Sequence, residues 1–244
     1  GFNNAALIVS DQNTFPGIDV ARFGESINII ADRATFEGTS VIEQIDGACT
    51  MFERYYSVET IEGARRATHY SIPYEAFREA VANAVAHRTW DVNAKIRIAM
   101  HPNCIEISSP GGLPAGLGRD EYLRGFISQL RNPILANVLF RLNIIEMFGT
   151  GIVRIRSSYA EYEQKPEFDV SENAVRVTLP VTDARPVLTS EEELVYRFVK
   201  EEGPTASGQI VANFGFGKDK AVKLLRSLVE KRYIEKTGTG RGTK

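Results

Sequence analysis

The chain has 244 residues, 43% of them hydrophobic and 25% charged, which is ordinary for a globular protein with one large domain or two modest ones. No apolar run approaches the ~20 residues that a membrane-spanning helix needs, and no signal peptide is present. We therefore expect a cytoplasmic protein without a membrane partner. Cys49 and Cys104 are isolated thiols, which fits a reducing compartment and argues against a zinc site.

The formal net charge of −2 conceals an uneven distribution along the chain. Nine Lys and Arg residues but only three acids lie between Gly215 and Lys244, so this tail carries about +6 and the rest of the chain about −8. A basic stretch on an acidic protein indicates a polyanion contact confined to that end.

The first seventy residues give mixed strand and helix signals. Residues 2–10 are apolar and fit either a helix or a strand. The other elements predicted here are strands at 20–23 and 26–31, a turn-rich connection at 32–39, a helix from Ser40 to about Val58, and a strand at 65–71. Ile72-Pro73 then ends that strand, because the residue before a proline avoids the helical conformation.

The segment from Tyr74 to Arg88 predicts a helix that carries a pair of polar residues. Its apolar residues recur at helical spacing and predict a face packed on a core. Glu79 and Asn83 are four residues apart, so both project from one face. A buried carboxylate needs a partner or a metal, and a carboxylate beside an amide suits a divalent ion with a polarised water. The alternative is an amphipathic helix with two polar residues at its rim.

Two glycine turns follow this helix. Strands at 95–100 and 104–108 predict a hairpin, and the second strand runs into Ser108-Ser109-Pro110-Gly111-Gly112. Phe148-Gly149-Thr150-Gly151 opens a helix predicted at 151–162, where free backbone N–H groups form a natural anion site. The remaining predictions are a glycine-rich lid or surface loop at 113–132, helical segments at 133–143 and 144–147, a strand at 174–180 and a linker at 182–187.

The tail predicts a separate small unit over residues 188–244. Thr189 and the acids after it predict a helix start, and further helices are predicted at 206–213 and 218–231, before a strand with a glycine-rich tip that begins at Tyr233. Three helices and a basic wing resemble a winged helix-turn-helix, whose third helix would enter the major groove of double-stranded DNA. The residues predicted to contact DNA are Lys218, Lys220, Lys223, Arg226, Lys236 and Arg241. Winged helices also serve as dimerisation or protein-binding modules, and the basic excess favours DNA.

The motifs of the first part of the chain, taken together, resemble the N, G1 and G2 boxes of the Bergerat-fold (GHKL) ATPases. A narrower resemblance, over roughly residues 1–180, is to the ATPase-like half of bacterial "RecG-like" transcription regulators. It is carried by Glu-Ala-Val-x-Asn-Ala-x-Ala-His-Arg, Pro-Gly-Gly-Leu-Pro, Arg-Asn-Pro and Gly-Thr-Gly-Ile. The regulators usually carry an AlbA-type (Schlafen-like) domain first, so we expect that this chain, which starts at Gly1, lacks an N-terminal domain.

The resemblance implies an α+β fold. A Bergerat α/β sandwich would occupy residues 1–182, with N-terminal strands and a helix over 1–70 and a motif-bearing core over 71–182. The winged helix would follow over residues 188–244. A homodimer is the expected assembly.

The resemblance also implies ATP and Mg²⁺ as cofactors. Asn83 would ligate the magnesium, and Glu79 would position or activate the attacking water. Other residues implied to bind the nucleotide are His87, Arg88, Ser108, Gly111, Gly112, Gly149, Thr150 and Gly151. His87 and Arg88 equally suit the C-terminal cap of their helix. Arg131-Asn132-Pro133 is either a helix start or a phosphate contact.

The chain departs from the superfamily pattern in its G1 box, where an Asp normally reads the adenine amino group and this chain has no acid. Two functions of different classes follow. One is a transcription regulator in which ATP and Mg²⁺ modulate DNA binding, with slow hydrolysis at most. The other is a non-enzymatic DNA-binding protein whose degenerate ATPase-like domain serves dimerisation or partner binding. A protein kinase of the anti-sigma type is a third hypothesis, which the basic tail argues against. No Gly-x-x-x-x-Gly-Lys-Ser/Thr occurs, which excludes a P-loop helicase motor.

Overall fold

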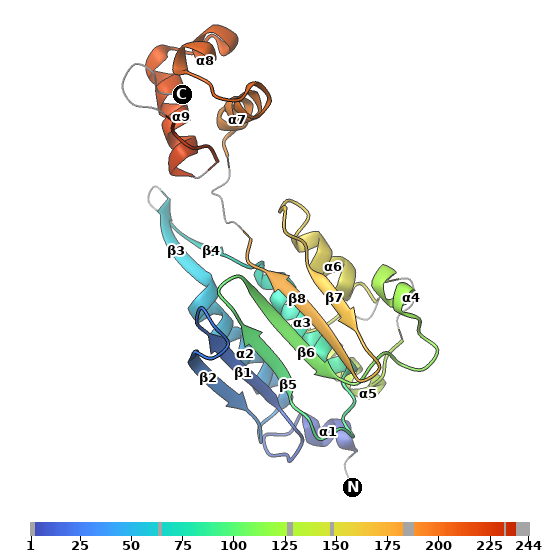
Figure 1. Ribbon diagram of the computed structural model, residues 1–244. Helices are drawn as coiled ribbons and strands as arrows, with labels where there is room; N and C mark the ends of the chain where they lie inside the picture. The colour runs from blue at the N-terminus through green and yellow to red at the C-terminus, as the bar shows by residue number, and fades with distance from the viewer. Residues whose placement is uncertain are drawn as a thin grey trace. The chain divides into compact units, whose positions relative to one another are not determined.

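The computed structural model describes residues 3–62, 65–125, 129–146, 149–182, 188–231 and 233–237. The chain divides into two compact units, Gly1–Asp183 and Ala184–Lys244, and each is treated by itself (Figure 1). Within the described ranges, none of the helices combines the length and the apolar character that crossing a membrane requires.

The first unit is built on a six-stranded sheet with the strand order β2-β1-β5-β6-β8-β7. The strands β1 and β5 are parallel, and the other neighbours are antiparallel. The strands are β1 (Ile18–Phe23), β2 (Ile30–Phe36), β5 (Ile96–Met100), β6 (Cys104–Pro110), β7 (Glu167–Val170) and β8 (Ala174–Pro180). Alternate residues of the central strands are buried, as expected for a sheet with one covered face.

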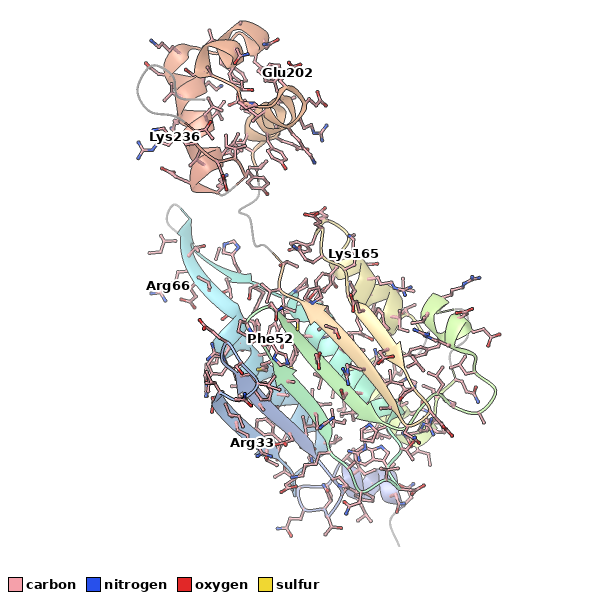
Figure 2. All side chains as sticks on the ribbon, in the orientation of Figure 1. Arg33, Phe52, Arg66, Lys165, Glu202 and Lys236 are labelled. Carbon is pink, nitrogen blue, oxygen red and sulfur yellow. The ribbon has the colours of Figure 1, made fainter. Side chains whose placement is uncertain are left out.

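Helices cover one face of this sheet (Figure 1). The helices of this unit are α1 (Asn4–Ile8), α2 (Val41–Tyr56), α3 (Tyr74–His87), α4 (Arg119–Arg124), α5 (Pro133–Arg141) and α6 (Gly151–Ser158). Helices α2 and α3 pack directly on the sheet, while α1 packs on α5 and α4 on α6. The ring of Phe52 on α2 stacks on Phe77 of α3, with 4.3 Å between ring centroids, in the interior of the unit (Figure 2). Both side chains are fully buried, so the helix that carries Glu79 and Asn83 is fixed by the core beneath it.

Several predicted boundaries were wrong in this unit. The helix predicted from Ser40 to about Val58 ends at Tyr56, where the unpredicted strand β3 (Ser57–Glu62) begins. This strand forms a hairpin with β4 (Arg65–Tyr70), which confirms the strand predicted at 65–71. The second strand lies at 30–36 rather than 26–31. Polar contacts with β1, and not an apolar face, accompany its pairing there, so the apolar residues at 27–30 did not mark its position. On this outer edge Arg33 and Thr35 both bond Asp19, each at 2.8 Å (Figure 2). Residues 144–146 are not helical, and the short strand β7 was missed.

The described residues of the second unit form three helices, α7 (Ser190–Glu202), α8 (Ser207–Phe214) and α9 (Lys218–Glu230). Its core is small and holds Val195, Ile210, Ala221 and Leu228. The connection from α8 to α9 is the three-residue turn Gly215–Gly217, in which Gly215 adopts the left-handed conformation with φ 66°. A short glycine-containing turn between two helices is also found in the helix-turn-helix motif.

The predicted wing is not found in the described part of the tail. Residues 233–237 contain no strand, although one was predicted to begin at Tyr233. The glycine-rich tip, Arg241 and most of the predicted linker at 182–187 lie outside the described residues. The winged form of the fold therefore stays a prediction.

Candidate functional site

Helix α3 brings Glu79 and Asn83 together on its buried face. Asn83 Nδ2 donates a hydrogen bond to Glu79 Oε1 at 3.2 Å, and the Glu79 residue is only 5% exposed. Burial raises the pKa of Glu79, while the Asn83 hydrogen bond acts in the opposite direction. Since the Asn83 amide nitrogen is committed to Glu79, its oxygen remains available to a ligand or metal.

The second glycine turn packs directly on this pair. A Cβ atom placed on Gly151 would lie 2.4 Å from Asn83 Nδ2 and 2.8 Å from Glu79 Oε1. Only a glycine permits this approach, so the first turn of α6 lies against the two polar side chains of α3. The structure thus brings together two motifs that are almost seventy residues apart in the sequence.

A cavity opens beside the pair and is bounded by α3, β6, the glycine loop after β6, α4 and the start of α6. Its walls are largely apolar and include Ala80, Ile107 and Val177. Of the residues predicted to bind a nucleotide, those that line it are Asn83, His87, Gly111, Gly112, Gly149 and Gly151. Burial lowers the pKa of His87, and the nearby Arg131 lowers it further, so its imidazole is neutral at physiological pH.

The first glycine loop is held close to its neighbours. A Cβ on Gly111, where φ is 98°, would lie 2.0 Å from Thr89 Oγ1, and one on Gly112 would lie 2.3 Å from the carbonyl oxygen of Glu172. Arg131 Nη2 donates to the Gly112 carbonyl at 2.7 Å. The loop therefore presents its backbone to the cavity in one fixed form.

The Arg131-Asn132-Pro133 segment connects this loop to the end of α3. Asn132 Nδ2 donates to the carbonyls of Ala86 and Arg88, at 2.9 Å and 2.8 Å. Proline occupies the first position of α5, where its missing N–H is not needed. These contacts favour the structural reading of the segment over the phosphate contact.

Three residues predicted to bind a nucleotide do not line the cavity. Ser108 lies on the opposite face of β6, because side chains alternate along a strand. Its neighbour Ser109 faces α3, is 7% exposed and donates from Oγ to the Ala84 carbonyl at 2.9 Å. Of the two serines, Ser109 rather than the predicted Ser108 therefore lines the cavity. Thr150 Oγ1 is buried without a hydrogen-bond partner in the described residues.

Arg88 is the third of these residues. Its side chain is fully buried and donates to the carbonyls of Pro16 at 2.8 Å and Ala94 at 2.6 Å. Its guanidinium also lies over the Trp90 ring, 4.3 Å from the centroid. We therefore assign Arg88 to the support of the loop after α3 rather than to a ligand.

Tyr122 and Glu146 are among the cavity residues that were not predicted from the sequence. Tyr122 enters from α4, and Glu146 lies just before the second glycine turn. Glu146 forms an ion pair with Arg154 at 3.4 Å, and Arg154 also favours the ionised form of Glu79. Neither residue belongs to a periodic pattern, so only the fold reveals them.

The donor set suits a magnesium ion that is held together with phosphates. Among the described residues no three His, Cys, Asp or Glu side chains converge as a metal cluster. Magnesium bound with a nucleotide needs only one or two protein oxygens, and Asn83 Oδ1 offers one. The free N–H groups at the start of α6 suit an anion beside it.

In the second unit the predicted DNA contacts are exposed but partly paired. Lys220 bonds Glu191 at 2.6 Å, and Arg226 bonds Glu230 at 2.9 Å. Lys218 and Lys223 are exposed on α9, as is Lys236 after it (Figure 2). Over residues 184–244 the sequence has twelve Lys and Arg residues against eight Asp and Glu residues, so the unit as a whole is basic. A basic unit attracts a polyanion, and the positions of the bases decide which face would meet it.

Comparisons with known proteins agree with this geometry. Residues 93–179 match the family model described as "Putative ATP-dependent DNA helicase recG C-terminal". The match includes both glycine turns, whereas Glu79 and Asn83 precede it. No curated protein matches the chain.

Among solved structures, the DIP2311 protein from Corynebacterium diphtheriae is similar in fold, with a TM-score of 0.63 and 20% identity. The alignment covers 93% of this chain and 50% of that one, so this chain spans about half the length of that protein. Together with the sheet, the covering helices and the two glycine turns, the family match shows that the chain carries an ATPase-like domain of the RecG C-terminal type.

Proposed function

We propose that the first unit binds ATP with Mg²⁺ and that the second binds double-stranded DNA, so that the nucleotide state modulates DNA binding by a transcription regulator. The observation that carries the nucleotide half is the Glu79–Asn83 pair packed under Gly151, beside the fixed Gly111–Gly112 loop. Homodimerisation remains part of the proposal.

The proposal gives roles to Asn83, which lines the cavity, to the start of α6, and to Glu79, which is bonded to Asn83 but is not among the described lining residues. Asn83 Oδ1 would ligate the magnesium, which supplies positive charge for the phosphates when bound. The N–H groups at the start of α6 would bind phosphate oxygens. Glu79 would accept a proton from a water, and its burial favours proton uptake. Any hydrolysis is expected to be slow.

The alternative function is a DNA-binding protein whose ATPase-like domain no longer binds a nucleotide. It is favoured by the composition of the cavity wall, because no Lys or Arg is among the described residues that line it. The acid that reads adenine in the superfamily is also replaced, since Ser109 occupies the wall there.

Calorimetry with ATP and Mg²⁺ separates the two functions. We expect the wild-type protein to bind ATP only when Mg²⁺ is present, and Asn83→Ala to weaken binding ~10-fold or more, because a metal ligand is lost. Asn137→Ala is the matched control, since Asn137 is exposed on α5, outside the cavity, and donates to the Pro133 carbonyl of its own helix. If the wild-type protein binds no ATP, the proposal that the first unit binds a nucleotide fails, and the alternative of a DNA-binding protein with a non-binding ATPase-like domain is favoured.

Salt titrations of DNA binding test the other half. The double substitution Lys218→Gln and Lys223→Gln should reduce the slope of log affinity against log salt by about 2, because each lysine that meets a phosphate contributes about one released counterion. Lys200→Gln, at an exposed position on α7, serves as the control. An unchanged slope on a mixed-sequence duplex would remove α9 from the DNA interface.

A further inference from the structure

Helix α4 lies within the segment that the sequence left as a lid or a surface loop. It has only six residues, and a helix this short is not stable in isolation. At its start the Glu121 carboxylate accepts from the Gly118 N–H at 3.0 Å, and at its end Gly125 adopts the left-handed conformation with φ 66°. The position of α4 must therefore depend on its contacts with other elements.

Those contacts are made mainly with α6. A Cβ on Gly125 would lie 3.2 Å from Val153 Cγ2, so the end of α4 lies against α6. Arg156 Nη1, also from α6, donates to the Leu123 carbonyl at 2.6 Å. This carbonyl is one of the last four of α4, which have no partner inside the helix, and a cation is favourable at that end.

Arg156 also connects α4 to the edge of the sheet. Its guanidinium carbon lies 5.2 Å from the centroid of the Phe168 ring on β7. One side chain thus contacts the end of α4 and the edge strand at the same time. An arginine suits this position because its planar group can stack on a ring while it donates hydrogen bonds.

The residue before Leu123 is Tyr122, which lines the cavity. Burial raises the pKa of Tyr122 to about 12, so its phenol stays neutral and can donate a hydrogen bond. A tyrosine ring also offers a flat apolar surface to a planar ligand. The hydrogen bond from Arg156 to the Leu123 carbonyl therefore holds the residue next to Tyr122, which lines the cavity.

We propose that Arg156 is a positioning residue that latches α4 against the cavity, so that Tyr122 contacts the bound nucleotide and release requires the latch to open. The identity of the ligand rests on the proposed function. The latch itself depends only on the described contacts between α4, α6 and β7.

Trypsin tests the latch without any nucleotide, because Arg119 and Arg124 are cleavage sites at the two ends of α4. On the full chain, Arg156→Met should raise the cleavage rate after these residues ~10-fold, as expected when a hydrogen bond from a charged group is lost and the open form is populated more. Arg156→Lys keeps one donor and should restore most of the protection. Arg176→Met is the control, at an arginine on the outer face of β8 that pairs with Glu106. Equal cleavage of wild type and Arg156→Met would overturn the latch.

Stopped-flow release of a fluorescent ATP analogue tests the contact. Tyr122→Ala and Arg156→Met should both accelerate release ~10-fold, with rescue by Arg156→Lys and a smaller effect of Tyr122→Phe, which keeps the ring. Wild-type release rates in Tyr122→Ala would overturn the contact. If the wild-type protein binds no nucleotide, the proposed function and the Tyr122 contact both fail, whereas the trypsin result still decides the latch.

Discussion

The substitution Gly151→Ala is expected to destabilise the first unit and to disrupt nucleotide binding together. The new methyl group would lie 2.4 Å from Asn83 Nδ2 and 2.8 Å from Glu79 Oε1, so one or both side chains must move. Overpacking of this kind costs ~1–3 kcal/mol, and the better helix propensity of alanine returns at most ~1 kcal/mol. A displaced Asn83 could no longer direct its oxygen at a metal.

Urea unfolding followed by tryptophan fluorescence measures the first effect, because Trp90 is the single tryptophan and lies in this unit. Calorimetry with ATP and Mg²⁺ measures the second. The matched control is Gly118→Ala, where the nearest atom to the new Cβ, at 3.3 Å, is the flexible end of the Glu121 side chain. A Gly151→Ala protein that matched this control in both assays would contradict the packing of α6 on Glu79 and Asn83.

The sequence predicted the centre of the candidate site because its signals there are local. Helical spacing placed Glu79 and Asn83 on one face of α3, and the two polar side chains do meet there. A glycine turn before an apolar helix placed the start of α6 correctly at Gly151. What the sequence did not predict is the reason for that glycine, which is its close approach to a helix distant in the chain.

Ser108 and Arg88 were placed in the site because the sequence does not show which way a side chain points, and the fold decides that direction. A strand's two faces differ by one residue, so choosing Ser108 instead of Ser109 put the hydroxyl on the wrong face of β6. Arg88 follows His87 directly, but its position at the end of α3 turns its side chain to the carbonyls of the next loop. Consecutive residues of a helix do not share a face.

The elements that were misplaced or missed have weak local signals. The strand β2 has no buried residue and is exposed along most of its length, so its pairing with β1 rather than a buried face holds it in the sheet. Helix α4 is too short to be stable without α6, so its existence is a property of the tertiary structure. Tyr122 could therefore not be assigned to the cavity from its neighbours in the sequence.

The second unit depends on a buried carboxylate that links its first and third helices. Glu192 Oε2 accepts from the Thr189 N–H at 2.6 Å, which closes the start of α7. From the C-terminal part of α9, Ser227 and Lys231 donate to the same carboxylate at 2.6 Å and 2.7 Å. The Glu192 side chain is 5% exposed, so these partners replace the water that would otherwise stabilise its negative charge.

Substitution of Glu192 by alanine should therefore destabilise this small core by about 2 kcal/mol. Removing one partner of a buried ion pair costs ~3–5 kcal/mol, and the partial exposure of Lys231 reduces that value by screening. Hydrogen exchange measured by mass spectrometry should show faster exchange in α7 and α9, with no change in α3. Glu201→Gln, at an exposed position of α7, is the control. Unchanged protection of α9 in Glu192→Ala would show that the link does not hold the helices together.

The same carboxylate gives the second unit a defined acid sensitivity. Burial alone would raise the pKa of Glu192, but its hydrogen bonds to Lys231 and Ser227, with that of the helix cap, lower it from 4.5 to about 2. Because the folded-state pKa lies below that of the unfolded chain, this stabilisation is complete above about pH 4.5 and is lost as the pH falls towards 2. The wild type and Glu192→Gln should therefore differ most at neutral pH and converge through this window. A difference that stayed constant down to pH 2 would mean that the charge of Glu192 contributes nothing and that its shape alone holds α7 to α9.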